Sequence, residues 1–112
     1  MKQFSEVSAV EAIALTAGGA MLLDVREQDA WDRGHSPLAK LVPMSMLPEG
    51  LEDVPTDQRV LVVCHAGSRS LRVTNALLDA GYEAVNVVGG MLAWTAAGGE
   101  IVADGADAPR VD

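Results

Sequence analysis

The sequence predicts an α/β fold built on a small, open, mainly parallel sheet with helices on both faces. Three short runs, residues 21–25, 60–63 and 84–88, consist mainly of apolar residues, which is typical of strands buried on both faces of a parallel sheet. The segments between these runs carry apolar residues at helical spacing. Regular alternation of strands and helices predicts a mainly parallel sheet.

Start and stop signals predict the elements of the first half. Ser8 and Glu11 have the spacing of a capping box, in which two side chains satisfy the first backbone N–H groups of a helix. The glycines at 18–19 end that helix. Residues 27–33 suit a short helix, and residues 41–42 suit a brief strand.

The second half contains two further predicted helices. Residues 48–55 form a connection with at most one turn of helix. Helices are predicted over residues 71–80 and 91–97, because apolar residues recur there at helical spacing and glycines follow. The two tryptophans, Trp31 and Trp94, are expected to be core anchors, since large aromatic side chains bury much apolar area.

Length and composition predict one domain over residues 1–102 with a short tail. A chain of 112 residues with 49% hydrophobic residues can form a single core. Residues 103–112 are mainly small or acidic, so we expect a disordered acidic tail.

Charge and cysteine content exclude several classes of protein. The formal net charge is −8, which argues against nucleic acid or an anionic membrane as a partner. A single cysteine cannot form an internal disulfide or a four-cysteine zinc site. Residues 1–6 lack the apolar core of a signal peptide, and no apolar run approaches the roughly 20 residues of a membrane span. We therefore expect a cytoplasmic protein.

The cysteine lies where a nucleophile would be expected. Cys64 ends the strand at 60–63, and a loop of small residues then leads into a helix. Ligands bind at the carboxyl edge of parallel sheets, and helix N-termini and arginines stabilise a thiolate. A lone cysteine at a strand end is more often a small buried hydrophobe, but the small residues Ala66, Gly67 and Ser68 leave space for a ligand, and Arg69 adds charge.

Three groups of residues together resemble a known family. Residues 23–27 with Trp31 and the Gly-His pair at 34–35, then residues 63–70, then residues 88–94 occur in the order seen in a single rhodanese domain. The resemblance covers residues 4–102. The connection at 34–40 lacks the glycine of the usual Gly-His-Ile-x-Gly-Ala pattern, so its conformation is not predicted.

The resemblance implies a thiosulfate sulfurtransferase that needs no metal or organic cofactor. Cys64 would attack the outer sulfur of a small anionic donor such as thiosulfate, become a persulfide, and pass the sulfur to cyanide or a thiol. Arg69 would strengthen the field and attract the donor. Backbone N–H groups would hold the persulfide charge; these substrate-binding residues are His65, Ala66, Gly67, Ser68 and Ser70.

The length of the loop bears on the alternatives. Cys64 to Arg69 spans six residues, one fewer than in cysteine phosphatases, and a smaller ring of amides favours a persulfide over a phosphocysteine. A phosphatase or arsenate reductase is therefore disfavoured, also because a second cysteine is missing. A sulfur-carrier or regulatory interaction domain, with a protein as sulfur donor or acceptor, remains an open alternative.

Each of four further residues has two possible roles. Asp24 and Arg26 end a neighbouring strand and either brace the cysteine loop by hydrogen bonds or form a surface ion pair. Arg72 either meets anionic substrate at the rim or is simply exposed. His65 either lines the pocket or is an exposed loop residue, because a thiolate already ionised by its loop needs no base.

Overall fold

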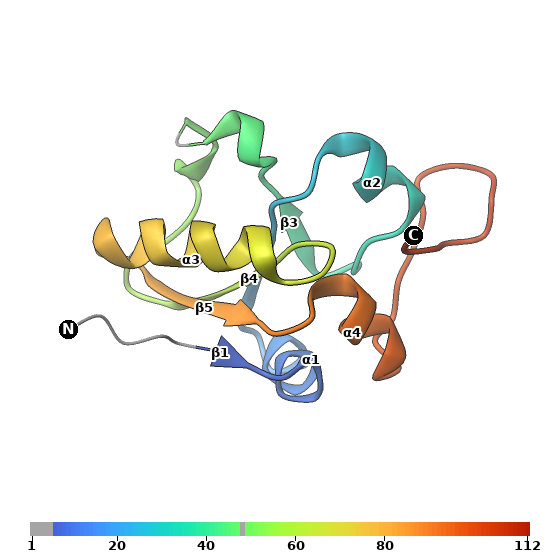
Figure 1. The fold of residues 1–112 in the computed structure, drawn as a ribbon, viewed down its shortest axis with the longest axis horizontal. Coiled ribbons are helices and arrows are strands. Elements are labelled where there is room, and N and C mark those ends of the chain that lie inside the picture. The colour runs from blue at the N-terminus through green and yellow to red at the C-terminus, as the bar shows by residue number, and fades with distance from the viewer. Residues whose placement is uncertain (1–5, 48) are drawn as a thin grey trace.

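The computed structural model describes residues 6–47 and 49–112, which contain a five-stranded parallel sheet with helices on both faces (Figure 1). Every strand pair in it is parallel. The order across the sheet is β1 (Glu6–Val7), β5 (Glu83–Val87), β4 (Arg59–Val63), β2 (Met21–Asp24) and β3 (Ala39–Leu41). The α/β class expected from the sequence is confirmed, although the short strand β1 was not predicted.

Helices cover both faces of this sheet. Figure 1 shows α3 on one side of the strands and α1 and α4 on the other. The helix α2 follows β2 directly, and two single 3₁₀ turns lie between β3 and β4. The bounds are α1 (Ala9–Ala17), α2 (Gln28–Arg33), η1 (Met44–Met46), η2 (Glu49–Leu51), α3 (Ser68–Asp79) and α4 (Gly90–Ala96).

The central strand β4 divides the core into two layers. Successive side chains of a strand point to opposite faces, so Val60 and Val62 pack under α3 while Leu61 and Val63 pack on the side of α1 and α4. All four side chains are fully buried. This explains why the strand has an uninterrupted apolar run, as a strand covered on both faces requires. Cys64, the next residue, follows a strand that is buried on both faces.

The capping box predicted at the first helix is confirmed. The Glu11 N–H donates to Ser8 Oγ at 3.1 Å, and the Ser8 N–H donates to Glu11 Oε1 at 3.2 Å. The single turn expected within 48–55 corresponds to η2, while residue 48 lies outside the described residues. A capping box depends on residues only three positions apart, so it can be predicted without knowing which elements pack against the helix.

Two predicted boundaries are wrong for a common reason. The strand expected at 41–42 is β3, which begins at Ala39 and pairs with β2. The helix expected to begin at residue 71 begins at Ser68, because the polar residues of its first turn carry no apolar period. Pairing with β2 fixed the first bound and the left-handed turn at Gly67 fixed the second, and neither is visible in hydrophobic periodicity.

The two tryptophans have different environments. Trp94 is 3% exposed and belongs to the core beside α1, as expected. Trp31 is half-buried and lies outside the core clusters among the described residues. Its ring stacks on His35 with the ring centroids 3.7 Å apart and the planes within 8°. The expectation of a core anchor is therefore wrong for Trp31, which instead packs against the connection that leaves α2.

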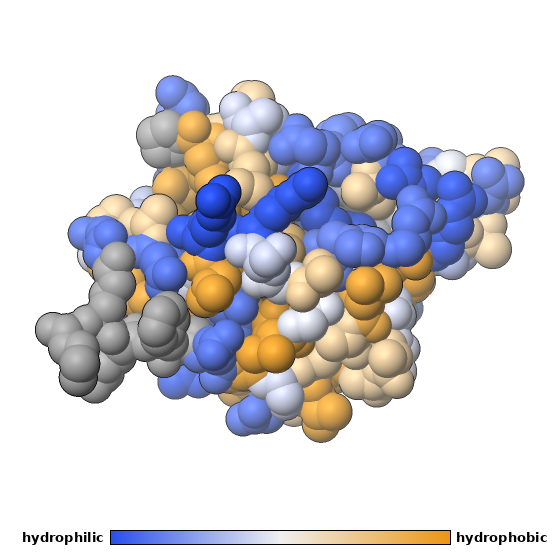
Figure 2. Space-filling model, viewed as in Figure 1, coloured by the Kyte–Doolittle hydropathy of each residue, from blue (hydrophilic) through white to orange (hydrophobic). Residues whose placement is uncertain are grey.

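Polar and apolar side chains are unevenly distributed over the surface of the described residues. Figure 2 shows hydrophilic side chains over α2 and the C-terminal segment, whereas apolar side chains gather around α1 and α4. Val10, Val88 and Leu92 contribute exposed apolar side chains on these elements and the turn that precedes α4. No helix of the described part of the chain has the length and hydropathy to cross a membrane.

The C-terminal segment, residues 103–112, has neither helix nor strand and lies against α2. The Arg110 N–H donates to the Arg33 carbonyl oxygen at 2.9 Å, and Arg33 Nε lies 2.7 Å from Asp112 Oδ2. The backbone passes so close to Gly34 that a Cβ there would collide with the Arg110 backbone. The boundary at residue 102 and the disorder of the tail stay predictions.

We predict that this segment exchanges its amide hydrogens much faster than the sheet does. Single hydrogen bonds and exposed ion pairs hold it, and exposed pairs contribute about 0–1 kcal/mol each. Hydrogen exchange followed by NMR should show rapid exchange at Asp104 and Arg110 and slow exchange at Val62 and Val85. Equal protection of both sets would contradict a disordered tail.

Candidate active site

Cys64 lies at the point where the chain connections of the sheet diverge. The chain leaves β2 toward β3 on one side, and leaves β4 toward β5 on the other. Between two adjacent parallel strands whose connections run in opposite directions, a crevice opens at the carboxyl edge, and ligands of open α/β sheets bind there. Cys64 follows β4 directly, so the fold places it beside this crevice.

Gly67 turns the chain from the strand into the helix. It has a φ of 102° and precedes α3 as its N-cap residue, a left-handed conformation that side-chain-bearing residues rarely adopt. This turn brings the Gly67 N–H to within 3.1 Å of Cys64 Sγ, to which it donates. The sulfur therefore lies at the N-terminus of α3, where the helix dipole and unpaired N–H groups favour negative charge.

The pKa of Cys64 is lowered by its loop. Burial acts in the opposite direction and raises the pKa of the thiol, but hydrogen bonds to the sulfur outweigh it. Ser70 contributes most to this lowering, followed by the backbone N–H groups of Gly67 and Ala66. Arg69, which the sequence suggested would favour the thiolate, is not among these causes. The thiolate is the nucleophilic form of cysteine, so the loop prepares the sulfur for attack.

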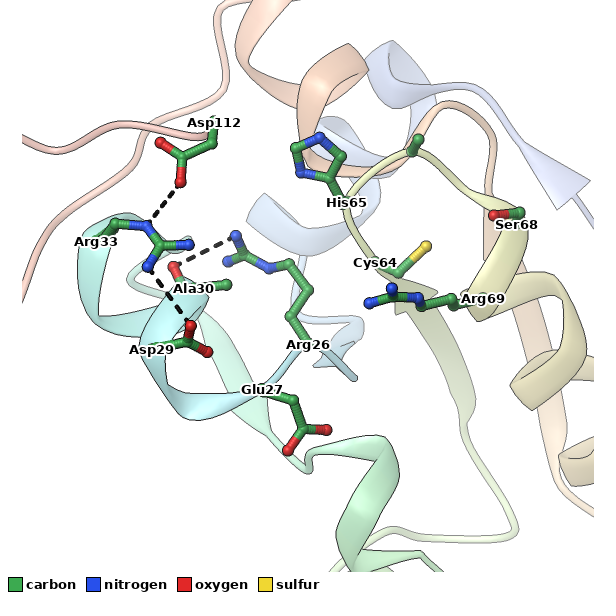
Figure 3. Close-up of a pocket in the computed structure, with 11 residues that line it drawn as sticks. Arg26, Glu27, Asp29, Ala30, Arg33, Cys64, His65, Ser68, Arg69 and Asp112 are labelled. Carbon is green, nitrogen blue, oxygen red and sulfur yellow. Dashed lines mark hydrogen bonds and ion pairs between the residues drawn. The ribbon is translucent and has the colours of Figure 1, made fainter.

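A pocket of about 460 Å³ lies between the cysteine loop and α2. Figure 3 shows Cys64 and Arg69 on the loop side of this space and Arg26 on the side of α2. The loop contributes Cys64, His65, Ala66, Ser68 and Arg69; the segment from β2 through α2 contributes Arg26, Glu27, Asp29, Ala30 and Arg33; and Asp112 completes the lining.

The charges around the pocket are only partly balanced. Arg33 pairs with Asp112 at 2.7 Å and with Asp29 at 3.6 Å, as Figure 3 shows. Hydrogen bonding by Arg110 and the charge of Arg33 lower the pKa of Asp112, so its carboxylate stays ionised. Among residues 6–47 and 49–112, none of the ion pairs involves Arg69. Arg69 is therefore the pocket cation available to an anionic ligand.

Asp24 and Arg26 form a buried ion pair that supports α2. Arg26 Nη2 lies 2.7 Å from Asp24 Oδ2, and the two side chains are 4% and 0% exposed. The same Nη2 donates to the carbonyl oxygen of Gly34 at 2.8 Å, at the end of α2. The interpretation as a surface ion pair is wrong, because Asp24 ends β2 in the core and Arg26 follows it beneath α2. Their hydrogen bonds go to α2 and to each other, not to the cysteine loop.

The other site residues expected from the sequence separate into two groups. His65, Ala66 and Ser68 line the pocket, whereas Gly67 and Ser70 are buried behind the loop. Arg72 lies apart from them, at an apolar groove of about 300 Å³ between α3 and the 3₁₀ turns. A role at the pocket rim is therefore wrong for Arg72, since it lies one turn further along α3 than Arg69, away from the N-terminus of the helix that faces the pocket.

A pair of glycines, Gly89 and Gly90, fixes the loop from the side of β5. The Met91 N–H donates to the Cys64 carbonyl oxygen at 2.7 Å, and the Leu92 N–H donates to the His65 carbonyl oxygen at 3.1 Å. The first turn of α4 thus binds the cysteine loop directly. A Cβ on Gly90 would overlap the Cys64 carbonyl oxygen and lie 2.6 Å from that of His65. In the sequence these two glycines contribute to the family resemblance, but nothing there indicates their contact with the cysteine loop.

Comparison with known proteins agrees with this geometry. Residues 8–97 match the model of the Rhodanese-like domain. The chain is 41% identical over 104 residues to thiosulfate sulfurtransferase 18 of Arabidopsis thaliana, covering 79% of this chain and 76% of that protein. It is 34% identical over 84 residues to a sulfurtransferase of Allochromatium vinosum, covering 74% of this chain and 78% of that protein.

Solved structures give the same family. A rhodanese-related protein of Thermoplasma volcanium superposes with a TM-score of 0.80 at 26% identity, covering 88% of this chain and 98% of that chain. The chain belongs to the rhodanese-like domain family. Its relatives support a sulfurtransferase activity in general terms. Within the described residues, no three His, Cys, Asp or Glu side chains are grouped so that they could hold a metal ion.

We predict that Gly90→Ala disrupts the cysteine loop, whereas Gly19→Ala does not. Both glycines have a positive φ, 59° at Gly90 and 106° at Gly19, but nothing lies within 4 Å of a Cβ at Gly19. Gly19→Ala should therefore cost only about 1 kcal/mol of backbone strain. Gly90→Ala adds a collision with two carbonyl oxygens, and we expect it to cost at least about 2 kcal/mol more. Urea unfolding of the two variants measures the difference, and equal losses would mean that the loop tolerates the added atom.

The lowered pKa of Cys64 predicts a pH dependence of both reactivity and stability. Alkylation by iodoacetamide, followed against pH, should show a midpoint below the ~8.5 of an ordinary cysteine, and Ser70→Ala should raise this midpoint. A thiol whose pKa is lower in the folded state stabilises the fold above its unfolded pKa. That contribution is lost as the pH falls through the folded pKa.

The stability arm of this prediction compares the native protein with Cys64→Ser. The difference in their free energies of unfolding should move in favour of the native protein as the pH rises from the folded toward the unfolded pKa, and then level off. Unchanged alkylation in Ser70→Ala, or a stability difference that does not vary with pH, would show that the loop does not favour the thiolate.

Proposed function

We propose that the chain moves a sulfane sulfur from a small anionic donor such as thiosulfate to cyanide or a thiol through a persulfide on Cys64. The observation that carries the proposal is the N–H of Gly67 at 3.1 Å from the Cys64 sulfur, at the start of α3 and inside an open pocket. A donor set of this kind stabilises negative charge on sulfur. It suits both the attacking thiolate and the persulfide anion that follows.

The reaction balances without a cofactor. The Cys64 thiolate attacks the outer sulfur of thiosulfate, a new S–S bond forms to Cys64, and the old S–S bond breaks with its electron pair leaving on sulfite. The acceptor then attacks the outer sulfur of the persulfide. The thiolate of Cys64 leaves with the electron pair of that bond and is ready for another donor. No net oxidation of the protein occurs, so a single cysteine suffices.

Arg69 provides a positive charge that can attract an anionic donor to a protein of negative net charge. The formal net charge of −8 repels a dianion such as thiosulfate. Arg69 lines the pocket with Cys64 and no ion pair among the described residues neutralises it. We propose that it attracts and orients the donor. Since a reduced Cys64 is required, a reducing compartment such as the cytoplasm suits this chemistry.

A protein donor or acceptor remains the second candidate. The pocket is open and its volume of about 460 Å³ exceeds what one thiosulfate ion needs, so it leaves room for a larger sulfur carrier. Under this alternative the persulfide still forms on Cys64, but transfer to free cyanide is slow. The two candidates differ in the second half-reaction and not in the first.

We predict that incubation with thiosulfate adds the mass of one sulfur atom to the protein, and that cyanide removes it and forms thiocyanate. Intact-mass spectrometry and a colour assay for thiocyanate measure the two steps. Cys64→Ser should do neither. A persulfide that forms readily but reacts slowly with cyanide would favour the sulfur-carrier alternative.

The same preparation tests the phosphatase alternative. The native protein should show negligible hydrolysis of an aryl phosphate, because the attacked phosphorus carries three oxygens that a six-residue loop is too tight to enclose, whereas thiosulfate presents only its outer sulfur. An unchanged mass after thiosulfate, with the protein folded and reduced, would refute the persulfide. Aryl phosphate hydrolysis at the rate of sulfur transfer would favour the phosphatase reading instead.

A further inference from the structure

Asn86 is a polar residue at a buried position of β5, where an apolar residue would be expected. It lies in β5 between Val85 and Val87 and is 2% exposed. Strands covered on both faces are mainly apolar, and a buried amide without hydrogen-bond partners costs about 1–3 kcal/mol. Asn86 does not line the pocket, so contact with a ligand does not explain it.

The side chain of Asn86 is joined to the back of the cysteine loop. The Ser70 hydroxyl, itself fully buried, donates to Asn86 Oδ1 at 2.6 Å. The Asn86 Nδ2 group lies 3.5 Å from the carbonyl oxygen of Gly67 and 3.5 Å from Glu6 Oε2. One amide therefore contacts both Ser70 and Gly67, which are the two loop residues that are buried behind the sulfur.

These contacts contribute to the direction of the loop amides. The Gly67 carbonyl and the Ser68 N–H belong to one peptide unit, in which they point in opposite directions. The Gly67 carbonyl oxygen accepts the Leu71 N–H at 3.2 Å in the first turn of α3, and Asn86 Nδ2 adds a second contact to it. Together these contacts direct the Ser68 N–H to the opposite side, where Ser68 and Cys64 line the pocket. Glycine permits this peptide to rotate more freely than other residues do. A rotated peptide would present an oxygen to an anionic sulfur.

We propose that Asn86 is a positioning residue for sulfur transfer, which holds Ser70 and the Gly67 peptide so that the donors of the loop face the sulfur of Cys64. The proposal rests on the persulfide function proposed above. It adds a residue from a neighbouring strand that touches neither the substrate nor the reacting sulfur. The Ser70 hydroxyl donates its one proton in the hydrogen bond to Asn86 Oδ1. Asn86 therefore acts through the position of Ser70, whose backbone N–H also lowers the pKa of Cys64.

Asn86→Val tests the proposal, because valine suits a buried strand and removes both polar atoms. We expect the kcat for sulfur transfer from thiosulfate to fall on the order of tenfold, with KM nearly unchanged, since Arg69 and the pocket lining remain. The midpoint of Cys64 alkylation against pH should move upward, because Ser70 and the Gly67 peptide are no longer held with their N–H groups toward the sulfur. A role limited to stability would not move this midpoint.

Thr74→Val is the matched control. Thr74 is 1% exposed in α3, and its hydroxyl has no hydrogen-bond partner among the described residues. The substitution changes a buried polar side chain of the same helix that carries Ser70, without touching the loop. Its kcat and alkylation midpoint should match those of the native protein. Thermal unfolding of both variants records any loss of stability separately.

A double substitution tests whether Asn86 acts through Ser70. If it does, Ser70→Ala combined with Asn86→Val should raise the alkylation midpoint little more than Ser70→Ala alone. In Ser70→Ala the hydroxyl that contacts Asn86 is already absent, so the loss of Asn86 has little further effect. Additive shifts in the midpoint would overturn the connection between the two residues.

The outcomes separate this proposal from the function on which it rests. An unchanged alkylation midpoint in folded Asn86→Val, or equal losses of kcat in Asn86→Val and Thr74→Val, would overturn the positioning role. Should Asn86→Val fail to fold, Asn86→Ser, whose shorter side chain remains polar, gives the same comparison. A native protein that forms no persulfide would refute the proposed function, while the alkylation profiles would still decide whether Asn86 positions the loop.

Discussion

The left-handed turn at Gly67 is the constraint on which the site depends. It brings the N-terminus of α3 back over the sulfur of Cys64, so that the N–H of Gly67 donates to Sγ at 3.1 Å. Burial alone would raise the pKa of this thiol, and hydrogen bonds from the loop reverse that effect. Such hydrogen bonds help only if the donors are fixed before the charge appears, because donors that must reorganise contribute less stabilisation. The rest of the structure around the loop supplies this fixation.

Both neighbouring strands of β4 contribute to it, in different ways. After β5, the N–H groups of Met91 and Leu92 bind the carbonyl oxygens of Cys64 and His65. After β2, the buried Asp24–Arg26 pair holds α2, which forms the opposite wall of the pocket. Carbonyl oxygens that point toward α4 leave the N–H groups of the loop for the sulfur, since each peptide unit directs its two polar groups oppositely. The anion site is thus built mainly from backbone, and glycines are needed where two backbones meet.

The electrostatics of the pocket are local and oppose those of the molecule as a whole. The chain carries a formal net charge of −8, yet the pocket contains three arginines. Two of these are neutralised, Arg26 by Asp24 and Arg33 by Asp29 and Asp112. Arg69 is not paired within the described residues. The positive charge that remains is thus confined to the pocket, and the rest of the molecule is negative overall.

The sequence by itself determined the class of fold, the place of Cys64 and the presence of a small-residue loop before a helix. These features follow from apolar runs and from residues within a few positions of one another, which act in the same way in any context. Tertiary structure alone decided the rest. The partners of Arg26, the contact of Asn86 with Ser70, and the displacement of Arg72 from the pocket depend on which strands become neighbours. Residues 67 and 86 are separated by 19 positions, and only the parallel pairing of β4 with β5 brings their backbone and side chain together, which no local pattern encodes.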